Sequence, residues 1–230
     1  MLRMGCPGRG RGGGKGLKTI KKAKAGWKQN PEAVQRDILR VATAEFARNG
    51  LSGARIDRIA ARTKSSKRMI YYYFGDKDRL YARALEAAYA KVRAGEDQLD
   101  LAGLPPDEAL ARLVGFTFDH HRSNPAFIRM VMIENIHHAA FLAGSEAIRG
   151  MNLAAIDKLA DIVRRGEAAG LFRAGLDPIE LHWQISALSF FNVSNRATFS
   201  ALFGKALFGR ERQEHLRDHS VEMILRYVRV

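Results

Sequence analysis

Side chains suited to binding another molecule gather in one short stretch, residues 55–77. Lys67 and Arg68 stand near its middle, and three consecutive tyrosines follow at positions 71–73. Lysine and arginine donate hydrogen bonds to guanine O6 and N7 in the major groove of DNA, where a short exposed helix fits. The stretch therefore predicts a DNA-reading helix with Lys67 and Arg68 at its exposed start.

Two short helices joined by a polar turn would position these side chains. The first is expected at about residues 55–63, because its apolar side chains recur at helical spacing and its arginines point away from that stripe. The second would begin after the turn at residues 64–66, with Ser65 or Ser66 capping free backbone N–H groups.

A further helix upstream would complete a small head. Pro31 can open this helix, because the N–H that proline lacks would be unpaired there. Its apolar stripe ends before a predicted C-cap at Asn49-Gly50. Residues 31–76 thus predict a helix-turn-helix domain, and Asp76 would cap a fourth helix. The expected core residues of the head are Phe46, Leu51, Ile56, Ile59, Ile70 and Phe74.

The positive charge of the chain is concentrated near its N-terminus. Of the net +14, residues 1–30 supply +9 and residues 31–82 supply +5, while the remainder has eighteen basic and eighteen acidic side chains. A basic N-terminal third is expected where that part meets a polyanion. The alternative is a solvated basic tail beside a neutral enzyme.

Residues 1–30 form a Gly/Arg/Lys-rich segment that is predicted to be disordered, because its composition cannot bury enough apolar surface. Its Arg-Gly-Arg sequence could enter an A·T-rich minor groove, although most such tails add only nonspecific phosphate affinity. The only cysteine, Cys6, lies here, which excludes disulfides within the chain and fits a reducing compartment. Since no apolar stretch approaches the roughly 20 residues of a membrane helix, a cytoplasmic protein without a membrane partner is expected.

The chain beyond the head is expected to be entirely helical, which makes the predicted fold class all-α. Periodic segments are separated by proline and glycine breaks, and no convincing strand pattern occurs. The predicted helices span residues 107–121, 125–138, 145–169, 178–203 and 211–228. The last two carry more apolar surface than one domain face requires, so a second copy of the chain is expected to cover them.

Residues 66–80 read Ser-Lys-x-x-Ile-Tyr-Tyr-Tyr-Phe-Gly-x-Lys-x-x-Leu, which resembles the TetR family of bacterial transcriptional regulators. The resemblance covers about residues 38–85, and the rest of the chain shares only helical character and length with the family. It implies a homodimer that places one short helix of each subunit in a major groove of a palindromic operator. It also implies that residues 77–230 form a larger helical domain for effector binding and dimerisation.

The same resemblance assigns roles within the head. Residues 67–69 and Tyr72 would face base edges, Tyr71 and Tyr73 would lie nearer the phosphates, and Lys77 would contact the DNA backbone and couple the two domains. Tyr73 could instead pack the head against the fourth helix. The predicted DNA-binding residues are Arg55, Ser66, Lys67, Arg68, Met69, Tyr71, Tyr72 and Lys77.

Two positions depart from the family pattern. Ala54 stands where a threonine or serine usually caps the second helix, and the lost cap costs on the order of 1 kcal/mol. Arg55 could compensate through a phosphate. Lys64 stands where glycine is usual, so a residue with a side chain must adopt a turn conformation.

Histidines in the larger domain suggest either a metal site or a ligand pocket. His120-His121 and Glu134-x-x-His137-His138 have ligand-like spacing. The sequence favours a mostly apolar pocket whose polar members orient a small molecule, with plain core as the alternative for many of its aromatics. No metal or cofactor is expected. The predicted ligand-binding residues are Phe116, His120, Phe127, Met130, Glu134, His137, Phe141, Trp183 and Asn192.

The segments around Asn124, Glu134 and Asn192 are similar to a TetR subgroup that includes repressors of aromatic or heteroaromatic acid catabolism. This similarity implies a small aromatic or carboxylated effector. Arg129 or Arg196 could then pair with a carboxylate.

The leading hypothesis is a ligand-responsive DNA-binding regulator, more specifically a repressor. An enzyme is disfavoured because the Gly-rich run lacks a phosphate-loop continuation and no Gly-x-Ser-x-Gly or His-Glu-x-x-His motif occurs. An architectural or nonspecific nucleic-acid binder driven by the basic tail is the alternative.

Overall fold

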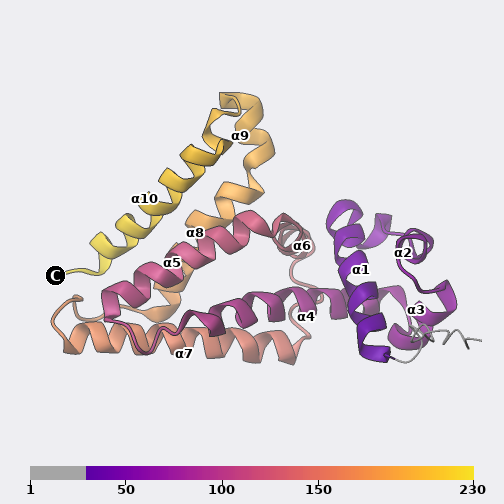
Figure 1. Ribbon diagram of the computed structural model, residues 1–230, viewed down its shortest axis with the longest axis horizontal. Coiled ribbons are helices and arrows are strands. Elements are labelled where there is room, and N and C mark those ends of the chain that lie inside the picture. The colour runs from indigo at the N-terminus through magenta and orange to yellow at the C-terminus, as the bar shows by residue number, and fades with distance from the viewer. Residues whose placement is uncertain (1–29) are drawn as a thin grey trace, which may run out of the picture.

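The computed structural model describes residues 30–230, which form helices joined by short loops (Figure 1). Of the tail predicted over residues 1–30, residues 1–29 lie outside the described residues. The head contains α1 (Pro31–Gly53), α2 (Ile56–Arg62) and α3 (Lys67–Phe74). The body contains α4 (Lys77–Glu96), η2 (Asp97–Leu99), α5 (Pro106–Ser123), α6 (Pro125–Ile136), α7 (Glu146–Ala168), α8 (Pro178–Ser194), α9 (Arg196–Phe203), η3 (Ala206–Phe208) and α10 (Arg210–Val228).

The all-α prediction is confirmed. Within residues 30–230 the only strand-like feature is an isolated bridge between Phe172 and Arg229. No helix in this part of the chain is long and apolar enough to cross a membrane.

Local sequence signals fix the ends of the head helices. The Asn30 side chain accepts a hydrogen bond from the Ala33 N–H at the start of α1. Gly50 has φ +67°, so the regular helix breaks at the predicted Asn49-Gly50 site before one further turn ends at Gly53. Asp76 caps α4 by accepting the Arg79 N–H at 2.7 Å, as predicted.

One apolar core joins the head to the body. The predicted head residues are all in it, with Phe46, Ile59 and Ile70 almost completely buried and Leu51 partly buried. The same cluster includes Leu80, Tyr81, Ala84 and Leu85 of α4, Met130 of α6 and Ile148 of α7. The head therefore packs directly on α4 and α6 (Figure 1), so a movement of either helix also moves α1.

A second core holds the body together between α5, α7, α8 and α10. Leu110, Leu159, Leu181 and Val228 are buried in it. Phe172 closes one end against Gly166, where a Cβ atom would overlap the phenyl ring. The loop through Phe172 also binds the end of α10, because the Arg173 N–H donates to the Val228 carbonyl at 2.8 Å.

Two predicted helices differ from the structure. The helix predicted over 178–203 is two helices, α8 and α9, because the chain leaves helical geometry at Asn195. The Asn195 amide donates to Ser194 Oγ at 2.8 Å, and such local side-chain bonds compete with helix continuation. The helix predicted over 125–138 ends at Ile136, and the next turn holds His138 and Ala139 at positive φ.

Candidate DNA-binding and effector sites

Helix α3 presents a polar face away from the core. Ser66 caps it by accepting the Met69 N–H at 3.3 Å, and Ile70 and Phe74 anchor it in the head. The opposite face exposes Lys67, Arg68, Tyr71 and Tyr72, of which Tyr72 is 77% exposed. A helix anchored on one side and open on the other can enter a DNA groove without unfolding.

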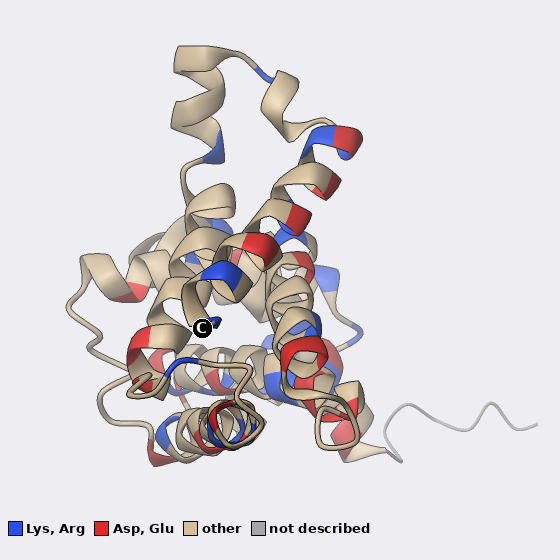
Figure 2. Cartoon of the chain, turned by 90° about the vertical axis from the view of Figure 1, so that its left-hand side faces the viewer, with Lys and Arg blue, Asp and Glu red and all other residues tan. Residues whose placement is uncertain are grey.

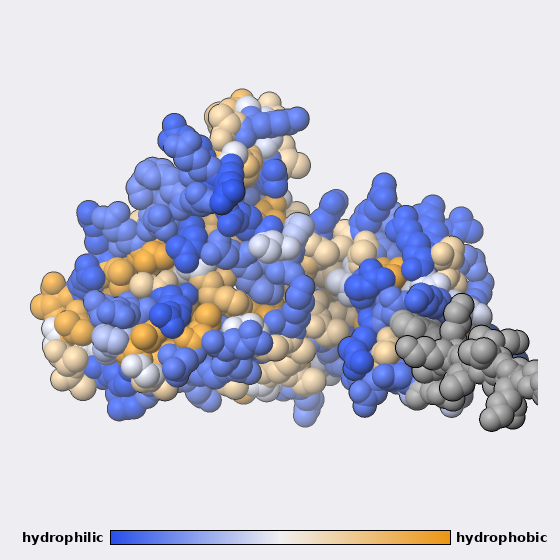
Figure 3. Space-filling model, viewed as in Figure 1, coloured by the Kyte–Doolittle hydropathy of each residue, from blue (hydrophilic) through white to orange (hydrophobic). Residues whose placement is uncertain are grey.

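The remaining predicted DNA-binding residues surround this face. Arg55 is exposed at the start of α2, Met69 is half-buried within α3, and Lys77 is half-buried as the first residue of α4. Tyr73 is partly buried against the head core, with its ring 5.2 Å from that of Tyr72. On the face shown in Figure 3, the head at the right is covered largely by hydrophilic side chains.

Lys67 is held by an ion pair within the head. Its Nζ lies 2.9 Å from Asp57 Oδ1 of α2, and both side chains are exposed. Hydrogen bonding to Asp57 raises the pKa of Lys67, and the same bond lowers the pKa of Asp57. A DNA acceptor that binds this ammonium group would therefore compete with Asp57 for it.

A buried carboxylate supports the start of α2. Glu45 of α1 accepts the Arg55 N–H at 3.4 Å and lies 3.6 Å from the Arg58 guanidinium and 3.9 Å from that of Arg62. The structure places the N-cap of α2 at Arg55, one residue after Ala54, and Arg55 makes no side-chain capping bond, so Glu45 instead binds the backbone N–H of the N-cap residue. Arg58 and Arg62 are exposed, as expected, and their guanidinium groups also lie within ion-pair distance of Glu45. Lys64 does not adopt positive φ, so it avoids the expected strain.

Three predicted ligand-binding residues come together inside the body. The ring of His120 lies 5.7 Å from Phe116 and 6.0 Å from Phe127, between centroids. His121, which was singled out only for its ligand-like spacing beside His120, and Tyr89, which the sequence did not indicate, complete this aromatic group. His121 is 6.0 Å from Phe127, and Tyr89 of α4 is 5.1 Å from it.

Basic side chains with unpaired nitrogens adjoin this aromatic group. Arg93 of α4 binds Glu96 at 2.5 Å and Asn152 at 2.8 Å, but its Nε is buried without a hydrogen-bond partner among the described residues. Both ring nitrogens of His120 and Nδ1 of His121 are likewise buried and unpaired. Buried donors without partners are costly, and their concentration here makes the spot suited to an acceptor-rich ligand.

The pKa values of the three histidines in and beside this cluster are all lowered, so protonation of these rings is disfavoured. Burial, followed by the charges of His120, His182 and Arg93, lowers the pKa of His121 to about 4. Burial also lowers the pKa of His120 and of His182, and Arg93 lowers both further through its charge. All three imidazoles are therefore neutral at pH 7, so the cations near the cluster are Lys91 and Arg93, and Arg93 is ion-paired with Glu96.

This cluster could hardly be predicted from the sequence. His121 was visible only as the neighbour of His120, whereas Arg93 and His182 lie on α4 and α8 and approach α5 only through tertiary packing. Arg129 and Arg196, the carboxylate partners expected from the sequence, are both exposed. The Arg196 guanidinium lies 5.3 Å from the Phe208 ring centroid.

Glu134 and two other predicted pocket residues belong to the joint between head and body. The Tyr81 hydroxyl donates to Glu134 Oε1 at 2.8 Å, and Glu134 Oε2 accepts the N–H groups of Phe141 and Leu142 at 3.1 and 3.0 Å. The Tyr81 ring lies 4.9 Å from that of Phe141. Met130 is fully buried in the same core. The Glu134 carboxylate is thus already engaged by protein donors.

The last three predicted pocket residues lie apart from the histidines. His137 is exposed after α6, and Trp183 is 70% exposed on α8. Asn192 exchanges hydrogen bonds with Gln213 of α10 at 2.8 and 3.0 Å. Within residues 30–230, no group of three or more His, Cys, Asp or Glu side chains could hold a metal ion.

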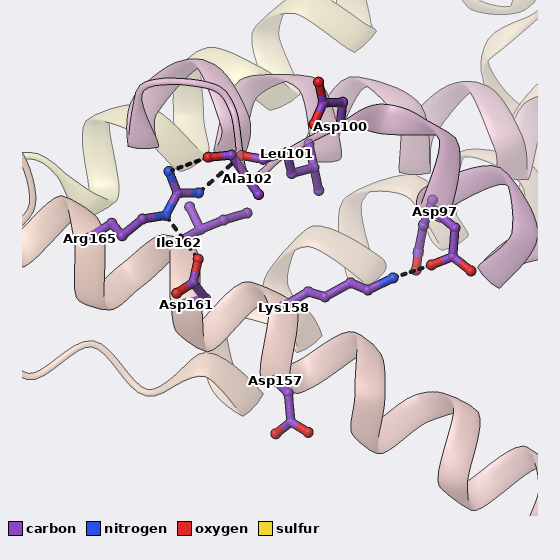
Figure 4. Close-up of a pocket in the computed structure, with 10 residues that line it drawn as sticks. Asp97, Asp100, Leu101, Ala102, Asp157, Lys158, Asp161, Ile162 and Arg165 are labelled. Carbon is purple, nitrogen blue, oxygen red and sulfur yellow. Dashed lines mark hydrogen bonds and ion pairs between the residues drawn. The ribbon is translucent and has the colours of Figure 1, made fainter.

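A separate surface groove of about 490 Å³ lies between α7 and the connection from α4 to α5 (Figure 4). Its charges are largely paired with each other or with backbone. Lys158 bonds Asp97, and Arg165 binds Asp161 at 2.9 Å and the Leu104 carbonyl at 2.8 Å. These contacts therefore hold the connection between α4 and α5 against α7.

Comparison with known proteins identifies the chain. The family model described as "Bacterial regulatory proteins, tetR family" matches residues 38–84. The family model described as "Tetracyclin repressor-like, C-terminal domain" matches residues 106–224. The chain belongs to the TetR family. Regulators of this family bind operator DNA, act as dimers and respond to small-molecule effectors, and this TetR-family chain is accordingly a DNA-binding regulator and no enzyme.

Named relatives agree with this assignment. The HTH-type transcriptional repressor NicS of Pseudomonas putida is 33% identical over 183 residues, which are 80% of this chain and 86% of NicS. The repressor SCO4008 of Streptomyces coelicolor is 32% identical over 70% of this chain and 79% of its own length. The crystal structure of SCO4942 from Streptomyces coelicolor, 25% identical, superposes with a TM-score of 0.63 over 83% of this chain and 97% of that one.

Proposed function

We propose that this TetR-family regulator is a homodimeric repressor that a small aromatic anion releases from a palindromic operator. Its relatives NicS and SCO4008 are named repressors, which supports the sign of regulation. In this proposal Lys67, Arg68, Met69 and Tyr72 read bases, while the other predicted DNA-binding residues contact the backbone.

The buried basic cluster is the observation that supports an anionic effector. A carboxylate would accept hydrogen bonds from Arg93 Nε and from a histidine N–H, whose nitrogens lack partners. A flat ring would fit beside Phe116, Phe127 and His120, which already meet at ring-contact distances. This proposal keeps three of the predicted ligand-binding residues and assigns the anion to Arg93 in place of Arg129 or Arg196.

Exposed apolar residues support dimerisation through α8 and α10. On α8, Ile179, Trp183 and Phe191 are exposed at four-residue multiples and therefore lie along one side of the helix. On α10, Met223 and Tyr227 are exposed in the same way. A stripe of this kind on a protein whose family acts as dimers suits a second copy of the chain.

Calorimetric titration with benzoate and with a pyridine carboxylate, each paired with its uncharged amide, tests the effector class. The proposal expects the acids to bind and to release DNA in a mobility-shift assay, whereas the amides bind at least about tenfold more weakly because they cannot form the ionic hydrogen bonds. Equal binding of acid and amide would contradict an anion site.

Matched arginine variants locate the site. Arg93→Lys keeps the charge but loses the planar donor fork, so acid affinity should fall about tenfold or more. Arg129→Lys is the control, because this side chain is exposed on α6. An unchanged affinity in Arg93→Lys together with a loss in Arg129→Lys would place the anion elsewhere.

A further inference from the structure

Helix α9 and η3 form an arm that projects from the body. Neither element contains a buried residue, and in Figure 1 the arm stands at the top, away from α4 and α7. Its aromatic rings pack against each other and against the end of α8, and Arg196 lies against the Phe208 ring. Phe199 lies 4.7 Å from Phe203, 6.3 Å from Phe208 and 6.5 Å from Phe191. Leu202 is 75% exposed and Phe203 is 70% exposed at the tip, so the arm's apolar side is uncovered.

A complementary surface lies at the opposite end of the same helices. Ile179, Glu180, Trp183 and Gln184 line a hollow of about 380 Å³ on the first turns of α8, which we call the base groove. Ile179 is 65% exposed there. The C-terminus of α10 is at this end too, because Arg173 Nε donates to the Tyr227 carbonyl at 2.8 Å just before α8 begins. Arm and base groove are therefore separated by the length of α8.

The charges of arm and base groove are opposite. Residues 196–208 contain Arg196 and Lys205 and no acid, as the mostly tan arm at the top of Figure 2 reflects. The start of α8, residues 177–184, contains Asp177 and Glu180 and no lysine or arginine, and Arg173 precedes it. Arg196, Lys205, Asp177 and Glu180 are exposed. Each surface therefore suits the other in both apolar character and charge.

Two-fold symmetry brings such surfaces together. In a symmetric dimer, a patch that contacts a second patch on the other copy receives the reciprocal contact, so both arms are covered at once. Antiparallel approach of the two α8 helices near their C-terminal ends, around Phe191, would bring α9 of each copy onto the base groove of the other. A head-to-tail contact between the same surfaces would leave an arm free and propagate into filaments.

We propose that each α9 arm clasps the base groove of a second copy of this chain, with Leu202 and Phe203 covering Ile179 and Trp183. Arg196 and Lys205 then face Asp177 and Glu180. This inference rests on the homodimer of the proposed function and assigns the α9 arm as the cover of the first turns of the α8 stripe.

Cysteine cross-linking of the full chain tests the contact directly. In a Cys6→Ser background, the double variant Ile179→Cys/Phe203→Cys should form disulfide-linked dimers rapidly under mild oxidation. Each single variant should cross-link at least about tenfold more slowly, because a 179–179 or 203–203 pair would be far apart in the clasped dimer. Faster linking by Phe203→Cys alone would show arms meeting tip to tip and overturn the proposal.

Sedimentation equilibrium separates failure of the clasp from failure of the dimer. Phe203→Lys should raise the dimer dissociation constant at least about tenfold, whereas Leu153→Lys, a matched change at an exposed α7 leucine, should leave it unchanged. Lys205→Glu should weaken the dimer, and adding Glu180→Lys should restore part of the loss. A wild-type dimer that tolerates Phe203→Lys would overturn the clasp alone, and a monomeric wild type would overturn both proposals.

Discussion

Asp57 and DNA would compete for Lys67, because the ammonium group that is expected to contact DNA is bound to Asp57 in the free protein. Asp57→Asn removes this competitor and one negative charge from the DNA-facing side of the head. Operator affinity should rise about two- to fivefold, since exposed ion pairs are weak and DNA attracts uncompensated cations. Fluorescence anisotropy at several salt concentrations measures the change.

Asp218→Asn is the matched control for this prediction. It makes the same charge change on an exposed residue of α10, far along the chain from the head. If both variants bound DNA more tightly by the same factor, net charge would explain the gain and the competition at Lys67 would be wrong.

His121 predicts acid sensitivity of the body. Its pKa is about 4 in the folded chain against 6.5 ordinarily, mainly because the ring is buried. Between these pH values the unfolded chain binds more protons, so the free energy of unfolding falls as the pH drops from 6.5 toward 4, by about 3 kcal/mol in total. His121→Gln should flatten this dependence in urea unfolding, and the exposed His215→Gln should not. If the free energy of unfolding of the wild type did not change between pH 6.5 and 4, the assignment would be refuted.

At the scale of elements, the contact between α4 and α6 joins effector site and head. Tyr81 and Glu134 connect these helices, and the Tyr81 ring also meets Phe46 of α1 at 5.1 Å. Tyr89 and Phe127, which border the basic cluster, lie on the same two helices. A ligand that moves α6 relative to α4 would therefore act on α1 through this joint.

Tyr81→Phe tests this coupling while keeping the ring. Loss of the hydroxyl leaves Glu134 Oε1 buried without its donor, so the free energy of unfolding should fall by about 1–3 kcal/mol. The ratio of operator affinities without and with benzoate should also move toward one. Full release by benzoate in Tyr81→Phe would make the hydroxyl purely structural.

The elements themselves were predictable where local signals are strong. Pro31, Gly50, Ser66 and Asp76 act within one turn of the chain, so their effect on helix ends can be seen in the sequence. The break at Asn195 was missed because the apolar pattern of α8 continues through it.

The candidate sites were less evenly predictable. The exposed face of α3 follows from helical spacing and from two buried anchors, Ile70 and Phe74. The basic cluster depends on the packing of α4, α5 and α8, and the sequence reasoning missed Arg93 for this reason. Glu134 was predicted to line the pocket because it is a polar residue in a largely apolar helix. Its carboxylate is instead bound by Tyr81 and by backbone N–H groups. Such partners become visible only in three dimensions.

At the scale of the whole molecule, charge and apolar surface are segregated. The N-terminal 82 residues carry the entire net charge of +14, and the exposed apolar side chains of the body concentrate on α8, α9 and α10. One end is thus suited to DNA and the other to a second subunit. Effector binding can change operator affinity only if it favours one relative placement of the two heads.

Selection of bound fragments from genomic DNA by the purified full chain tests this account most directly. The wild type should enrich one motif with two inverted half-sites, and a Lys67→Ala/Tyr72→Ala variant that remains folded and dimeric should lose that enrichment. Recovery of the same motif by the double variant, or enrichment of no motif by the wild type, would contradict the claim that α3 of each subunit reads the operator.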